Sequence, residues 1–136
     1  MRHLPICLTL AAALAAPALS HAAPYQDGHC QVTVPDGWVK SKTRIASPDK
    51  KVWASLLEAP TAAEILTVET GLKAVKVSEN AQQVLMVSTA SFGGQTNKQY
   101  HAITKTAPSC VADVTAPAGA DEALAKTIAQ SVVMKK

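Results

Sequence analysis

An alternation of apolar and polar residues predicts that the fold begins with a β-strand at residues 30–34. The even-numbered positions are apolar and the odd-numbered ones polar, which is the period of a strand with one buried face. The sequence Pro-Asp-Gly at 35–37 predicts a turn, because proline presets φ and glycine accepts a positive φ. The segment 51–59 is apolar on both faces and therefore predicts a strand inside the sheet.

A helix is predicted after Pro60, because Thr61 and Glu64 form the T-x-x-E pattern of a capping box. Its buried stripe is expected to consist of Ile65, Val68 and Leu72. Four further strands are predicted at 73–78, 83–91, 99–106 and 109–115.

The closing segment 120–134 predicts a second helix, since five apolar residues line one side at helical spacing. They are Leu124, Ala125, Ile128, Ala129 and Val132. Strands joined by short turns are antiparallel, so the order predicts an α+β fold: a single twisted, mainly antiparallel sheet with two helices packed against it. Trp38 and Trp53 adjoin apolar strands and are expected to fill the core, and the alternative is that they anchor a partner.

The N-terminus has the pattern of a cleavable signal peptide. Arg2 precedes an uncharged, Leu- and Ala-rich stretch at 4–19, and Ser20 and Ala22 are the small residues that signal peptidase requires. We therefore expect a signal peptide at 1–22 and one exported α+β domain at 23–136, in the periplasm and without a membrane anchor after cleavage.

Cleavage would remove Cys7 and leave two cysteines, Cys30 and Cys110. In an oxidising compartment these two predict one disulfide, and two unpaired buried thiols are the alternative. The bridge would join residues 80 positions apart. A loop of that length stabilises a fold by roughly 4 kcal/mol in the chain-entropy model.

The charge pattern argues against some classes of ligand. The expected mature chain carries twelve Lys and Arg against ten Asp and Glu, mostly scattered singly. Without a basic stripe or many aromatic residues, nucleic acid is not an expected partner. No glycine-rich phosphate loop is present, and we expect no cofactor.

Three short motifs resemble the PsbP/DcrB-like α/β fold family: "VTVPDGW" at 32–38, "SPDKKVWASL" at 47–56 and "AKTIAQSV" at 125–132. The family includes photosystem accessory proteins, periplasmic lipoproteins and immunity partners of secreted toxins. The resemblance implies an α/β fold that binds other proteins without catalysis. It transfers no functional residue, and the chain lacks the lipid-anchor cysteine of the lipoprotein members.

Enzymatic motifs are absent from the sequence, which has no G-x-S-x-G elbow and no H-E-x-x-H. A metal site could be assembled from Asp27, His29, His101 and Asp113, but their positions show no ligand spacing. We therefore predict no catalytic and no metal-binding residues. His29 is expected to be solvated and His101 to lie on a sheet face.

The segment 90–100 predicts an exposed hairpin tip, and hairpin tips often carry binding residues. The candidate partner-binding residues are Phe92, Gly93, Gly94, Asn97 and Lys98. The alternative is an ordinary loop with Phe92 folded back onto the sheet. The preferred function is an exported protein-binding module, such as an inhibitor or immunity protein against an exported enzyme or toxin. The alternatives are a small metal-binding protein or hydrolase using His29 or His101, and a structural accessory protein of the envelope.

Overall fold

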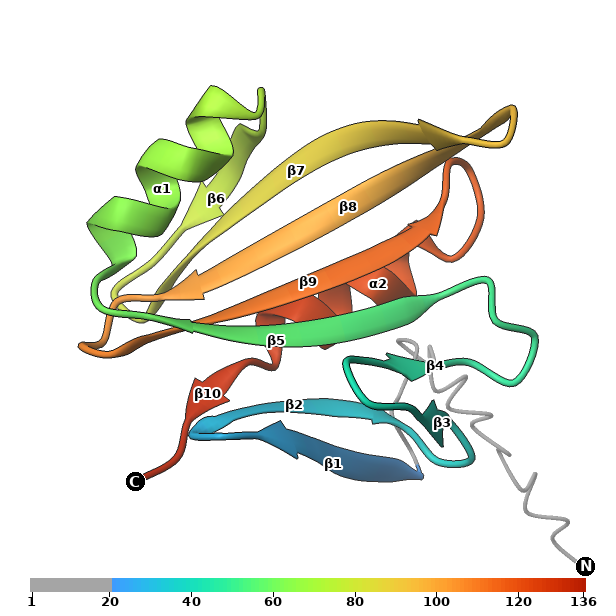
Figure 1. Cartoon of the computed structure of the whole chain (residues 1–136), viewed down its shortest axis with the longest axis horizontal. Helices are drawn as coiled ribbons and strands as arrows, with labels where there is room; N and C mark the ends of the chain where they lie inside the picture. The colour runs from blue at the N-terminus through green and yellow to red at the C-terminus, as the bar shows by residue number, and fades with distance from the viewer. Residues whose placement is uncertain (1–20) are drawn as a thin grey trace, which may run out of the picture.

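The computed structural model describes residues 21–136, so the predicted signal peptide falls almost entirely outside the described residues. Two sheets and two helices make up the domain (Figure 1). In chain order the elements are β1 (Ala22–Asp27), β2 (Cys30–Pro35), β3 (Val39–Lys40), β4 (Ile45–Ala46), β5 (Trp53–Ala59), α1 (Ala62–Gly71), β6 (Val75–Glu79), β7 (Gln83–Phe92), β8 (Gln95–Thr104), β9 (Ser109–Pro117), α2 (Glu122–Gln130) and β10 (Val133–Met134).

The larger sheet has seven antiparallel strands in the order β3-β4-β5-β9-β8-β7-β6. The predicted α+β class is confirmed, and β5 lies inside the sheet between β4 and β9, as its two apolar faces predicted. The expected single sheet is wrong, because β1, β2 and β10 form a second, three-stranded sheet.

The separation of the two sheets follows from the one apolar face of β2. Its buried residues Cys30, Val32 and Val34 pack with α2 and with one face of the larger sheet in a common core. A strand that buries its side chains against a sheet face lies in the next layer, and it cannot also pair with the edge of that sheet. The larger sheet therefore has α2 and the small sheet on one side and α1 on the other (Figure 1).

The disulfide between Cys30 and Cys110 is confirmed, with the two Cα atoms 5.5 Å apart. It joins β2 to β9 and thus ties the small sheet to the centre of the large one. Both cysteines are fully buried in the main core. An outer compartment, extracellular or periplasmic, is compatible with this bond. Among the described residues, no helix is both long enough and apolar enough to cross a bilayer.

The main core is built on the predicted face of α2. Ala125, Ile128 and Ala129 are completely buried there, Val132 is nearly so, and Leu124 packs against them. The helix is shorter than predicted and ends at Gln130. The chain then extends into β10, which pairs with β2.

Helix α1 begins as predicted, with the Thr61 hydroxyl accepting a hydrogen bond from the Glu64 amide. The predicted buried stripe is wrong in part, because Val68 and Leu72 are 54% and 68% exposed. Four residues at helical spacing instead face a smaller apolar core on the sheet. They are Ala62, Ile65, Leu66 and Glu69. Burial of Glu69 is possible because its carboxylate lies next to the ring of His101.

The tryptophans have different environments. Trp38 packs against the main core, as expected. Trp53 is half-buried and belongs to neither core, contrary to expectation. Its ring lies on the α1 side of the sheet with the Arg44 guanidinium 5.1 Å from the ring centroid.

Candidate functional site

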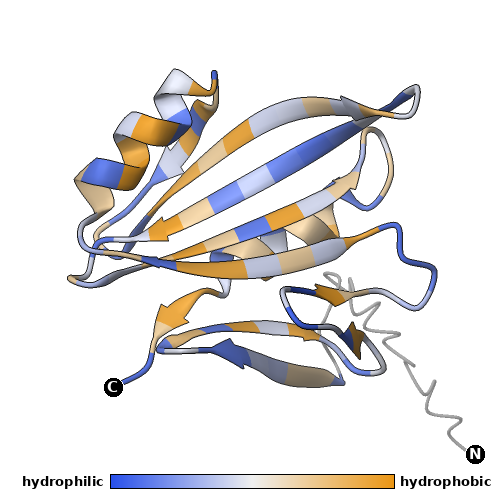
Figure 2. Ribbon diagram, in the orientation of Figure 1, coloured by the Kyte–Doolittle hydropathy of each residue, from blue (hydrophilic) through white to orange (hydrophobic). Residues whose placement is uncertain are grey.

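Helix α1 covers only one end of its sheet face. The register places Val84, Ile103 and Val111 side by side beneath the helix, in the smaller core. The next residues of β8 and β9 on the same face are polar, His101 and Asp113, whereas β7 continues with Met86 of the smaller core. Figure 2 shows the corresponding change along β8, which is hydrophilic over most of its length and apolar near its end.

Beyond His101, a row of side chains crosses six strands without a covering helix. From one edge to the other the register aligns Val39, Ala46, Trp53, Thr115, Gln99 and Ser88. Phe92, Gln95 and Asn97 lie on the same face closer to the β7–β8 tip. We call these nine residues the open face, although Thr115 and Asn97 are themselves buried.

At the boundary between α1 and the open face, four polar side chains from four elements meet. They are Glu69 on α1, Ser88 on β7, His101 on β8 and Asp113 on β9, and we call them the histidine cluster. His101 and Asp113 are direct neighbours across the β8–β9 pair. Ser88 lies one step further toward the tip on β7, where Met86 is the direct partner of His101.

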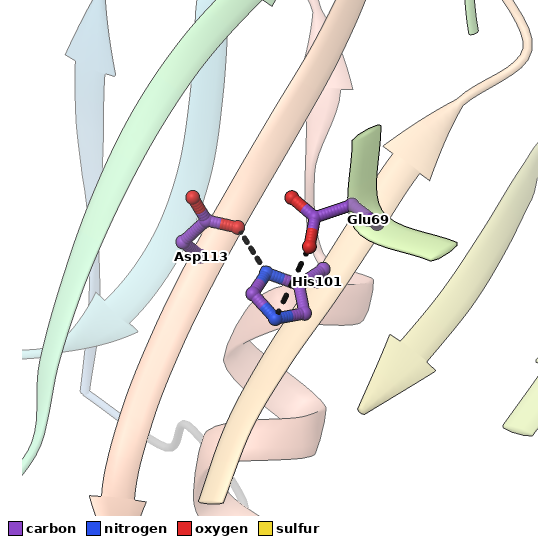
Figure 3. Close-up of side chains that lie close together, drawn as sticks. All are labelled: Glu69, His101 and Asp113. Carbon is purple, nitrogen blue, oxygen red and sulfur yellow. Dashed lines mark hydrogen bonds and ion pairs between the residues drawn. The ribbon is translucent and has the colours of Figure 1, made fainter. Parts of the chain in front are cut away.

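The His101 ring is held at both nitrogens. Its Nδ1–H donates to Asp113 Oδ1 at 2.5 Å, and Nε2 lies 2.8 Å from the Ser88 hydroxyl oxygen. A Glu69 carboxylate oxygen is 3.6 Å from the same Nε2 (Figure 3). When the ring is neutral, Ser88 donates to Nε2; when it is charged, Nε2–H donates to the Ser88 oxygen.

Because the cluster is partly buried, its contacts shift the pKa values of His101 and Glu69. Burial of the His101 ring opposes its charge, but the hydrogen bond and charge of Asp113, followed by the charge of Glu69, outweigh it and raise the pKa of His101. The pKa of Glu69 is also raised, first by burial and, to a lesser degree, by the charge of Asp113, with His101 acting in the opposite direction. The imidazolium is thus stabilised between two carboxylates.

A metal ion would need different contacts. Ligand atoms of Glu69, His101 and Asp113 lie within 4.8 Å of one another. Two ligand atoms on a tetrahedral Zn²⁺, however, lie about 3.3 Å apart, since metal–ligand bonds are near 2.0–2.1 Å. The 2.5 Å contact between Nδ1 and Oδ1 is therefore a hydrogen bond, which a metal shared by these two atoms would break and a metal on Nε2 would not.

The four residues considered from the sequence as metal ligands do not lie together in the structure. His101 and Asp113 are in contact, but His29 pairs with Glu58 at 2.7 Å. Glu58 lies opposite Cys110 and so points to the small-sheet side, whereas Asp113 points to the α1 side. The disulfide therefore does not place His29 beside Asp113. As expected, His29 is exposed and His101 lies on a sheet face.

The predicted hairpin tip is present, with a two-residue turn of Gly93 and Gly94 at φ of +54° and +80°. Phe92 is 52% exposed, so it does not fold back onto the sheet. Asn97 is buried, with only 6% of its surface exposed. Lys98 lies on the opposite face from Phe92, since strand side chains alternate. The five candidate residues therefore do not form one contact surface.

Two hollows adjoin Trp53 on the open face. One, of about 310 Å³, is lined among others by Val39, Arg44 and Lys50. The other, of about 240 Å³, lies between Trp53 and Phe92 and is bordered by Lys50 and Lys51. Apolar side chains thus alternate with cationic ones at this end of the sheet.

Comparison with known proteins does not assign the chain to a family. No protein-family model and no curated protein matches it. A crystal structure from Bacteroides thetaiotaomicron aligns with 86% of this chain at 13% sequence identity and a TM-score of 0.44. The alignment spans 43% of that chain, so this chain covers less than half of its length. The resemblance to PsbP/DcrB-like proteins therefore stays a hypothesis.

Sequence reasoning missed Glu69 and Ser88. Ser88 sits in a strand of ordinary alternation, and only the β7–β8 register brings its hydroxyl to His101. A signal for Glu69 was present, because it continues the helical spacing of Ile65 and Leu66 on α1. A carboxylate on the buried face of a helix needs a partner, and His101 was available.

Proposed function

We propose that this chain is an exported protein-binding module that presents its open face to an acidic segment of a partner protein. The observation that carries the proposal is the joint exposure of apolar and cationic side chains on one uncovered sheet face. Trp53 and Phe92 supply aromatic surface, and Arg44, Lys50 and Lys51 surround it.

Charge complementarity favours an acidic partner. Residues 39–51 contain five Lys and Arg, of which Lys40 lies over the Tyr25 ring on the other side of the sheet, and one acidic residue, Asp49. The Asp49 carboxylate accepts hydrogen bonds from the Ser47 hydroxyl and the Lys51 amide, so it is already engaged within the loop. A cationic rim around aromatic side chains speeds association with acidic surfaces and selects against basic ones.

Aromatic anchors and arginine often contribute most of the affinity of an interface. Trp53 is half-buried and held by the Arg44 guanidinium, which orders its ring before a partner arrives. A rigid anchor loses less conformational entropy on binding than a mobile one. These properties support Trp53 as the centre of the contact and Phe92 as a second anchor.

Export and resemblance support the same class of function. The signal-peptide pattern and the disulfide both agree with a periplasmic location. The motifs similar to PsbP/DcrB-like proteins agree with binding of other proteins. An inhibitor or immunity protein that blocks an exported enzyme or toxin would use such a surface, and a structural accessory protein of the envelope is the alternative.

The test uses the tagged mature chain, residues 23–136, as bait in envelope extract of the source organism. A captured partner is purified, and its affinity is measured for wild type, Trp53→Ala and the double variant Lys50→Glu/Lys51→Glu. Each should bind at least about thirtyfold more weakly, the effect of losing an interface anchor. Binding should also weaken as salt rises.

The matched control is Lys135→Glu/Lys136→Glu, which makes the same charge change at the C-terminus, beside His29. Its affinity should stay within about twofold of wild type. Equal losses in both double variants would show a nonspecific charge effect and overturn the proposed surface. Failure of the wild-type bait to capture any protein that binds it as a purified pair would overturn the function itself.

A further inference from the structure

We propose that Ser88 is a nucleophile toward uncharged carboxylic esters, activated by His101 and Asp113, and that the open face is where such an ester lies. This is an activity beyond partner binding, and it rests on the geometry of the histidine cluster.

The three side chains form a chain of hydrogen bonds with the polarity that nucleophilic catalysis requires. The Ser88 oxygen is 2.8 Å from Nε2 of His101, and Nδ1 of the same ring is 2.5 Å from Asp113. A base can take the serine proton only through a free ring nitrogen, and Asp113 provides this by holding the other proton on Nδ1. Asp113 also stabilises the imidazolium that forms.

The reacting hydroxyl is accessible from one side. His101 is 6% exposed, so the ring is fixed by its surroundings, whereas Ser88 is only partly buried. In the register Ser88 is the end of the row that includes Gln99, Thr115 and Trp53. An ester is proposed to approach Ser88 from this face, over Gln99, whereas Trp53 lies three strands away on β5.

A donor for the developing oxyanion is available next to the nucleophile. The side-chain amide oxygen of Gln99 is 3.4 Å from the Ser88 oxygen. The structure places the acceptor oxygen of this amide toward Ser88, so a half-turn of the amide group is needed before its N–H donors face a carbonyl oxygen there. Gln99 is thus the candidate stabiliser of the tetrahedral intermediate.

The proposed reaction has two balanced steps. The Ser88 oxygen forms a bond to the ester carbonyl carbon while its proton passes to Nε2 of His101. The carbon–alkoxy bond then breaks, the alcohol leaves with that proton, and an acyl-serine remains. In the second step a water molecule loses a proton to Nε2 and attacks the acyl carbon, and the carboxylic acid leaves as Ser88 regains its proton.

Glu69 determines both the choice of substrate and the pH dependence. Its carboxylate, 3.6 Å from Nε2, disfavours an anionic ester beside Ser88. It also favours the charged form of His101, which cannot accept a proton. The charged groups facing the ring are Asp113 from β9 and Glu69 from α1, and together they raise the pKa of His101. The reaction should therefore accelerate as pH rises through that raised pKa.

The test treats the mature, disulfide-bonded protein with p-nitrophenyl acetate and, separately, with a fluorophosphonate probe from about pH 6 to about pH 10. Release of p-nitrophenol and the mass of the protein are followed, and the modified residue is located by peptide mapping. We expect one adduct, on Ser88, with a rate that rises with pH. Ser88→Ala should lower the rate about a hundredfold or more, the range of a positioned general base and its nucleophile.

Three variants separate catalysis from an ordinary surface serine. Ser91→Ala, an exposed serine on the same strand, should react like wild type. Asp113→Asn should react far more slowly while circular dichroism shows a folded protein. Glu69→Gln should move the pH of half-maximal rate downward, because one charge that favours the imidazolium is lost.

The proposal is overturned if Ser88→Ala forms the adduct as fast as wild type, or if wild type forms none over the whole pH range. It is also overturned if Glu69→Gln leaves the pH profile where it was. Partner binding is tested separately, through Trp53→Ala and Lys50→Glu/Lys51→Glu, so the failure of one proposal is distinguishable from the failure of the other.

Discussion

His101 on β8 and Asp113 on β9 lie directly opposite each other, and the ring nitrogen Nδ1 donates to the carboxylate at 2.5 Å. The pair stands where helix α1 ends its cover of the sheet, so it borders both the smaller core and the open face.

The stability of the domain should fall as pH rises through the neutral range. The folded-state pKa of His101 is raised above its ordinary 6.5, so its contribution is fully present below pH 6.5 and is lost as pH rises through the folded value. The pKa of Glu69 is raised above 4.5, so its contribution to stability is also lost as pH rises, but at lower pH than that of His101. Urea midpoints measured across this range should decrease for wild type. His101→Gln should flatten the decrease above pH 6.5, and an equally steep decrease in that variant would contradict the assignment.

Loss of the disulfide should cost stability without changing the fold. Cys110→Ser leaves β2 and β9 joined only by packing, and the free energy of unfolding should fall by roughly 4 kcal/mol, less any structure retained in the unfolded chain. Urea denaturation with and without reductant measures the effect. Reductant should destabilise wild type to the level of Cys30→Ser/Cys110→Ser and leave that double variant unchanged.

The two helices should respond differently to truncation of one apolar residue. Ile128 on α2 is completely buried in the main core, so Ile128→Ala should lower the free energy of unfolding by about 2–5 kcal/mol. Val68 on α1 is 54% exposed, so Val68→Ala should change it by less than about 0.5 kcal/mol. Chemical denaturation compares the pair. A large effect of Val68→Ala would mean that the helix face predicted from the sequence is the buried one after all.

The β7–β8 turn should tolerate only glycine without strain. Gly94 has a φ of +80°, which an L side chain rarely adopts, so Gly94→Ala should destabilise by about 1 kcal/mol or more. Gly71, at the end of α1, has open space around its Cβ position and no positive φ. Gly71→Ala is the matched control and should be neutral or stabilising by about 0.4–1 kcal/mol. Thermal or urea unfolding of both variants provides the comparison.

Much of the fold was predictable because it depends on local periodicity. The capping pair Thr61 and Glu64, the buried side of α2 and the apolar strand β5 each follow from spacing within one segment. The disulfide was predictable for a different reason: only Cys30 and Cys110 remain after the expected signal cleavage. β1 was missed, since its sequence AAPYQD has no apolar–polar alternation, contains a proline and buries only Tyr25.

The amino-acid sequence by itself determined eight of the twelve elements, their order and the cysteine pair, but not the strands β1, β3, β4 and β10. Only the tertiary structure decided that β2 joins a separate sheet, that Phe92 and Lys98 face opposite sides, and that Ser88, His101, Asp113 and Glu69 meet. The physical reason is that hydrophobic periodicity states which face of a segment is buried but not what it is buried against. Strand pairing and register join residues distant in the chain, and they are set by the packing of the whole core.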